Sequence, residues 1–277
     1  MLAPTIEQRR ALARAVLRVG RDYRLIAFRA ADTHLHLEAL CGRAEAGRLA
    51  NRVEGSLHKT LRYPVRFEPA RIWPIADQRH LYNATRYILG QDQRHQLRDD
   101  PWAEASNLPD LLGLRTIGHF TAVELERSLP RLRFADLSAG LGLTPAQLTQ
   151  GDDWMGAIDD LAVATAAAVA LPHLEGRSGE VVAARRAAAV ATRAAVVSAR
   201  LVSLLGVSPR TARRLRAEQA DPALVEAVRR QLRLRAANRA SEGQAGEGRL
   251  GAPVTHIGLA SAGDGAAPQM PVRPDGP

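Results

Sequence analysis

The chain of 277 residues contains almost no cysteine and no long apolar run. The single cysteine, Cys41, excludes a disulfide framework and a cysteine-based zinc site. We expect no transmembrane helix, because no stretch of about 18 uninterrupted apolar residues is present. The first residues also lack the charged region and the following apolar run of a secretory signal. These shortages predict a cytoplasmic protein with no membrane partner.

Lysine and aromatic residues are also scarce, and arginine supplies the positive charge. Lys59 is the one lysine, aromatic residues make up 4% of the chain, and the formal net charge is +9. A basic protein favours a polyanionic partner, because each neutralised phosphate releases condensed counterions. A solvated basic surface in an arginine-rich composition would look the same. Charge therefore favours nucleic acid as the partner, and a nucleoid-associated location with it.

The first 114 residues alternate between helical and extended patterns. Apolar periodicity predicts helices at residues 6–19, 45–61 and 81–88, and strands at residues 23–28 and 34–39. The two strands are close enough in sequence to form a hairpin. Prolines bracket a further extended piece at residues 66–75. Asp77 is placed to act as the N-cap of the helix that follows it.

After residue 114 the strand signal disappears and the pattern becomes helical. Helices are predicted within residues 121–129, 146–148, 155–171 and 180–205. We divide the chain into a first domain at residues 1–114, a helical connection at 115–178, a helix-turn-helix region at 179–238 and a disordered tail at 239–277. The fold class predicted is α+β, followed by an all-α region.

The helix-turn-helix prediction depends on punctuation around residue 206. A helix ends at Gly206, Ser208 is placed to cap the next helix, and Pro209 occupies its first position. Three arginines on this second helix would contact DNA phosphates and base edges: Arg210, Arg213 and Arg214. A helical bundle with solvated arginines is the alternative.

The chemical signal of the chain is a pair of histidines followed by a tyrosine and a glutamine. His34 and His36 lie two apart on the second strand, so both imidazoles point to one face and can reach one cation. Tyr87 and Gln91 lie four apart on a helix and share its face. Glu38 continues the histidine face, either as an acceptor for an imidazole or as a surface carboxylate.

The order of these motifs resembles the single-tyrosine HUH transposases, which include the REP-associated tyrosine transposases and act on single-stranded DNA. The name denotes two metal-binding histidines around a hydrophobic residue, matched by His34-Leu35-His36. The catalytic tyrosine of the family begins a Tyr-Ile pair with a polar metal ligand four positions on, matched by Tyr87 and Gln91. Pro101-Trp102 resembles the Pro-Trp that follows the tyrosine helix in the family.

This resemblance implies a ferredoxin-like (RRM-like) antiparallel sheet with helices, and a metal-assisted nicking and rejoining activity. His34, His36 and Gln91 would hold Mg²⁺ or Mn²⁺, and Tyr87 would form a 5′-phosphotyrosine intermediate with single-stranded or hairpin DNA. Some members of the family carry an added helical DNA-binding module. The protein is expected to be a monomer or a homodimer.

The chain departs from the family pattern at residues 31–33, before His34, and at residues 91–96, which follow the tyrosine helix. The family also places a strand before the helix at residues 6–19, so we expect the chain to be truncated or decayed at that point. A non-catalytic DNA-binding descendant that retains the transposase fold is therefore the alternative function, and a metal-dependent hydrolase on another fold is a third. Tyr82 competes with Tyr87 as nucleophile. The two lie five residues apart, about 140° around the helix, so only one of them can face the metal. Gln91 lies on the Tyr87 face, which favours Tyr87.

Overall fold

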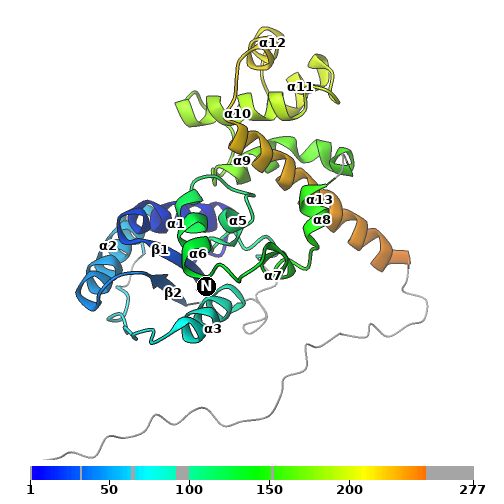
Figure 1. The fold of residues 1–277 in the computed structure, drawn as a ribbon. Coiled ribbons are helices and arrows are strands. Elements are labelled where there is room, and N and C mark those ends of the chain that lie inside the picture. Colours follow the sequence, from blue (N-terminus) through cyan, green and yellow to red (C-terminus); the bar gives the residue numbers. More distant parts are fainter. Residues whose placement is uncertain (1, 32, 64–65, 92–99, 151–152, 248–277) are drawn as a thin grey trace, which may run out of the picture. The chain divides into compact units, whose positions relative to one another are not determined.

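A computed structural model describes residues 2–31, 33–63, 66–91, 100–150 and 153–247 (Figure 1). The fold is α+β and mostly helical, with one small antiparallel sheet, which confirms the predicted fold class at this level. No helix in these ranges is both long enough and apolar enough to cross a membrane. Residues 1–239 group into one compact unit. The boundaries at residues 114 and 178 remain predictions.

Helix α1, Ile6–Gly20, begins at a capping box in which Thr5 and Gln8 exchange hydrogen bonds. Its apolar face is buried as the periodicity predicts. The chain then passes through the short 3-10 helix η1, Arg21–Tyr23, into strand β1, Leu25–Ala31. The first strand therefore begins two residues later than predicted and runs three residues further. Residues 21–23 are taken up by the 3-10 turn, and Arg24 adopts a left-handed conformation.

Strand β2, His34–Ala39, has the predicted bounds and pairs antiparallel with β1. Arg29 lies opposite His36 in this register, so the two side chains project from the same face of the hairpin. Helix α2, Arg43–Leu61, packs against α1 through a buried row of Leu49, Val53 and Leu57. Leu25, Phe28 and Ala30 of β1 belong to the same apolar cluster, so the hairpin packs on these two helices.

Helix α3, Gln78–Leu89, carries both tyrosines and begins directly after the predicted cap, Asp77, three residues before the predicted helical range of 81–88. The Asp77 side chain caps it by accepting a hydrogen bond from the His80 amide at 2.8 Å. The segment before it, residues 66–76, for which an extended piece was predicted at residues 66–75, contains neither helix nor strand. Most of its residues are exposed.

A short polar segment takes the place of a third strand along the free edge of β1. The Ala30 amide donates to the Ala105 carbonyl at 2.9 Å. The side-chain amide of Asn107 accepts from the Phe28 amide and donates to the Ile26 carbonyl, each at 2.8 Å. Asn107 thus satisfies two backbone groups that another strand would otherwise pair. The described residues form two strands, so the finer ferredoxin-like topology remains a prediction.

The described residues after 107 contain helices and no strand, as predicted. The helices are α5 Leu108–Leu111, α6 His119–Ser128, α7 Phe134–Ala139, α8 Pro145–Thr149, η2 Asp153–Asp160, α9 Leu161–Ala168, α10 Gly179–Ala191, α11 Ser198–Leu205, α12 Pro209–Ala217 and α13 Pro222–Glu247. Helices α9 to α13 enclose one apolar core of alanine, valine and leucine side chains.

Three helical predictions need correction. Residues 180–205 are not one helix, because the chain leaves helical geometry at Thr192 and is extended at Val197. Residues 155–171 divide into the 3-10 helix η2 and α9, and Ala170 has a positive φ. The predicted tail is helical in its first residues, since α13 continues to Glu247. The rest of the tail, residues 248–277, lies outside the described residues.

Buried charges connect the sheet to the rest of the first half of the chain. Arg29 on β1 pairs with Asp100 at 2.9 Å, and Arg10 on α1 pairs with Glu104 at 2.9 Å. Arg115 pairs with Asp110 at 2.5 Å and donates to the Glu104 carbonyl. All six of these side chains are nearly inaccessible to solvent, and their formal charges cancel. Each would be costly to bury without its partner.

We predict that Arg115→Met lowers the free energy of unfolding by about 3–5 kcal/mol, because it leaves the Asp110 carboxylate buried and unpaired. Urea unfolding measures this loss. Arg200→Met is the matched control: Arg200 pairs with Asp159 at 2.9 Å, but both side chains are exposed. An exposed pair contributes at most about 1 kcal/mol. Equal losses for the two variants would contradict the prediction.

Candidate active site

The hairpin and helix α3 bring both predicted histidines and the predicted tyrosine together. Alternation along β2 places His34 and His36 on one face, with ring centroids 5.3 Å apart. Helix α3 packs against β1 and β2 (Figure 1). Its Tyr87 ring lies edge-on to the His36 ring, with centroids 5.6 Å apart. Residues separated by some fifty positions in sequence therefore form one cluster at the surface, where Tyr87 is 45% exposed.

Gln91 follows α3 and is fully buried. Its Nε2 donates a hydrogen bond to the Tyr87 carbonyl at 2.8 Å. A carbonyl only accepts, so the amide nitrogen must face it and Oε1 must face away. Among the described residues, Oε1 finds no hydrogen-bond partner although it is buried. An unsatisfied buried acceptor is costly, and a cation ligated by this oxygen would remove the cost.

These residues fit the predicted cation. Two imidazoles and one amide oxygen suit Mg²⁺ or Mn²⁺ and leave coordination positions open for phosphate oxygens. In the part of the chain that the structure describes, no three His, Cys, Asp or Glu side chains gather in a way that could hold a metal ion. The structure thus groups Tyr87 with the two histidines, whereas Gln91 is bonded to the Tyr87 backbone and its place as the third ligand remains a prediction.

Glu38 and Thr85 fasten the histidine strand to the tyrosine helix. Glu38 is 3% exposed, which rules out the surface carboxylate considered from the sequence. Its Oε2 accepts a hydrogen bond from the Thr85 hydroxyl at 2.7 Å. Burial raises the pKa of Glu38 to about 7, and the Thr85 hydrogen bond partly opposes that rise. Thr85 was not among the predicted residues, and its one signal in the sequence is its spacing of four from the buried Leu81.

The other tyrosines have different surroundings. The Tyr82 ring contacts the Arg86 guanidinium, with the Arg86 Cζ 5.7 Å from the ring centroid. The Tyr63 hydroxyl donates to the Leu2 carbonyl at 2.6 Å, and burial raises the pKa of Tyr63 to about 12. Tyr87 is therefore the tyrosine whose ring lies against one of the two site histidines.

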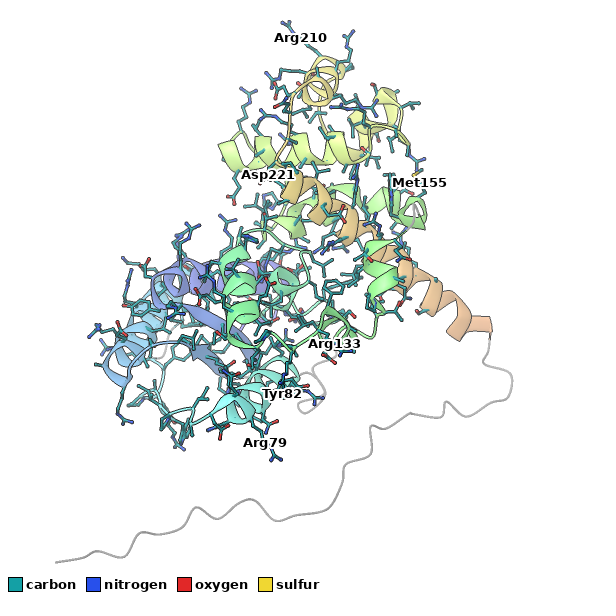
Figure 2. All side chains as sticks on the ribbon, in the orientation of Figure 1. Arg79, Tyr82, Arg133, Met155, Arg210 and Asp221 are labelled. Carbon is teal, nitrogen blue, oxygen red and sulfur yellow. The ribbon has the colours of Figure 1, made fainter. Side chains whose placement is uncertain are left out.

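The predicted DNA-contacting arginines lie on α12. Gly206 ends α11 in a left-handed conformation, and the Ser208 side chain accepts from the Thr211 amide at 3.2 Å, as the punctuation predicts. Ala212 and Leu215 of α12 are buried, while Arg210, Arg213 and Arg214 are exposed on the other side. Figure 2 shows Arg210 pointing outward from the helix.

These arginines differ in how far their charge is already neutralised. Arg214 lies 3.6 Å from the Glu218 carboxylate. Arg210 and Arg213 make no ion pair within the described residues. The first half of α12 therefore carries the available positive charge, next to the turn that begins at Gly206.

Searches with the whole chain against protein-family models, curated proteins and solved structures find no match.

The Glu38 environment predicts a pH dependence of stability in the metal-free protein. Unfolded Glu38 ionises near pH 4.3, whereas folded Glu38 holds its proton to about pH 7. Between these values the folded state binds more protons, so stability should fall as pH rises through this window, by at most about 4 kcal/mol. Glu38→Gln should remove this fall. Urea unfolding with EDTA at several pH values tests it, and parallel curves for the two proteins would contradict it.

Proposed function

We propose that the protein is a single-stranded DNA transposase or endonuclease of the HUH type, which nicks and rejoins DNA through a 5′-phosphotyrosine intermediate. The observation that carries this proposal is the contact between Tyr87 and His36, with His34 beside them and an unsatisfied Gln91 oxygen on the same helix end. A nucleophile next to two imidazoles suits phosphodiester chemistry.

In the proposed reaction the Tyr87 oxygen attacks the phosphorus and forms a P–O bond, and the bond from phosphorus to the 3′ oxygen breaks. The phenolic proton leaves to solvent, and the departing 3′ oxygen takes up a proton to become a hydroxyl. A bound Mg²⁺ or Mn²⁺ supplies charge stabilisation at the phosphate oxygens. Rejoining reverses these steps with a 3′ hydroxyl as nucleophile, so no external energy source is needed.

The residues around the nucleophile have separate roles. His34, His36 and Gln91 would hold the cation, and the hydrogen bond from Gln91 to the Tyr87 carbonyl orients the Gln91 amide. The Glu38–Thr85 hydrogen bond attaches β2 to α3. Arg29 lies opposite His36, and its positive charge is neutralised by Asp100.

We assign duplex or hairpin binding to α12, in the manner of a helix-turn-helix recognition helix. Its exposed arginines suit phosphate and guanine contacts. Helix α12 also packs on α10 and α11, which gives the arginine face a rigid support. This feature stands without the tyrosine site, so it equally supports the alternative of a non-catalytic DNA-binding protein that retains the transposase fold.

The tyrosine assignment predicts a covalent adduct. With Mg²⁺ or Mn²⁺, the purified protein should form a denaturation-resistant adduct with single-stranded hairpin DNA from its own locus. Tyr87→Phe should abolish the adduct, because it removes the attacking oxygen and little else. Denaturing gel electrophoresis with end-labelled DNA measures this.

Tyr82→Phe is the matched control, since it removes a hydroxyl from the same helix and should leave the adduct intact. Adduct that persists in Tyr87→Phe and disappears in Tyr82→Phe would overturn the assignment. Absence of adduct with the unaltered protein, together with retained DNA binding, would favour the non-catalytic alternative.

The α12 assignment predicts a change in salt dependence. Replacing Arg210, Arg213 and Arg214 with alanine should flatten the plot of log affinity for hairpin DNA against log salt, by about 0.9 for each duplex phosphate that the variant no longer neutralises. Helicity by circular dichroism should not change, because the three side chains are exposed.

The matched control is an Arg131→Ala, Arg177→Ala double variant, which removes exposed arginines outside α12. Its salt dependence should match that of the unaltered protein. If the α12 triple variant also matches, the arginines are a solvated face and contact no DNA.

A further inference from the structure

Trp73 is exposed in a way that the other tryptophans are not. Its exposed fraction is 70%, against 4% for Trp154. Trp102 is half-buried, and the Arg235 guanidinium lies over its ring at 4.9 Å. Tryptophan is on average among the more buried residues, and leaving its large apolar ring in water is unfavourable. The ring of Trp73 is therefore available to a ligand that would cover it.

The segment that carries Trp73 is held at both ends and near its middle. At its start, the Phe67 ring packs edge-on against Tyr63 and His58, with centroids 5.6 and 6.0 Å away. Near the middle, Arg43 on α2 donates to the Ile72 carbonyl at 3.5 Å. At its end, the Asp77 cap begins α3. The backbone on either side of Trp73 is thus attached to α2 and α3 while the ring stays in solvent.

The charge of this segment is mostly positive and available. Arg66, Arg71 and Arg79 are exposed and make no ion pair within the described residues, whereas Glu68 is exposed as a single nearby carboxylate besides the cap. Figure 2 shows Arg79 at the start of α3, directed away from the ribbon. An exposed aromatic ring between unpaired arginines is the combination by which proteins bind single-stranded nucleic acid.

We propose that residues 66–79 form a binding site for single-stranded DNA, in which a base stacks on Trp73 and the arginines contact the flanking phosphates. The occupant is single-stranded, because the face of a base is open to an indole only where it is not stacked inside a duplex. The segment leads directly into α3, the helix that carries Tyr87. The identity of that strand as the one to be cut rests on the proposed function.

The test is fluorescence anisotropy with a labelled oligo(dT) strand, the full chain and EDTA, which prevents nicking. Trp73→Ala should weaken binding roughly 5- to 100-fold, the range for one stacked base. Trp73→Phe should retain most of the affinity, because a phenyl ring still stacks. Val197→Ala is the matched control: Val197 is also 70% exposed but lies outside the segment, and its variant should bind normally.

Two further readouts make the result decisive. Binding of the strand should quench the tryptophan fluorescence of the unaltered protein, and this quenching should disappear in Trp73→Phe. The affinity for fully paired duplex DNA should be the same in Trp73→Ala and the unaltered protein. Equal affinity of the two proteins for oligo(dT), or an equal weakening on duplex, would overturn the stacking site.

The outcome is separable from that of the nicking reaction. If Trp73→Ala weakens strand binding while no phosphotyrosine adduct ever forms, the site stands and the proposed activity fails. If the adduct forms through Tyr87 and Trp73→Ala binds oligo(dT) as the unaltered protein does, the activity stands and the site fails. Thermal unfolding of Trp73→Ala should match that of the unaltered protein, because the ring it removes is mostly in solvent.

Discussion

The buried pairing of arginines with carboxylates is the constraint on which the first half of the molecule depends. Arg29 lies on β1 opposite His36 and pairs with Asp100, so the strand that pairs with the histidine strand is held by a charge pair inside the protein. Asp100 in turn accepts the Glu104 and Ala105 amides, which positions the segment that lines the free edge of β1. Asp100 therefore both neutralises a buried arginine and positions the residues around the hairpin that carries the candidate site.

Local pattern predicted the elements better than their contacts. The second strand and the caps at Asp77 and Ser208 depend on residues next to one another, and the structure has them as predicted. The extended piece at residues 66–75 did not become a strand, since prolines describe backbone shape and not whether a partner edge exists. Asn107, which completes the sheet edge, was invisible because its partners lie some eighty residues away.

The candidate site was predictable where periodicity alone sets direction. Spacing of two on a strand placed His34 beside His36, and the choice of Tyr87 over Tyr82 followed from helical geometry. The burial of Glu38 and its bond to Thr85 were not predictable, because they depend on how closely α3 packs on β2. The exposure of Trp73 was also not predictable from the sequence, because a tryptophan side chain is ordinarily expected to be buried.

The two halves of the chain are joined by specific polar contacts. Arg14 on α1 binds the Glu180 carboxylate at 2.6 and 2.8 Å and the Val169 carbonyl at 2.7 Å, and Gln231 on α13 donates to the Leu114 carbonyl at 3.0 Å. Contacts of this kind would fix the distance between α12 and Tyr87. Under the proposed function, the number of nucleotides between the DNA bound by α12 and the phosphate attacked by Tyr87 would be set by the protein and not by the DNA.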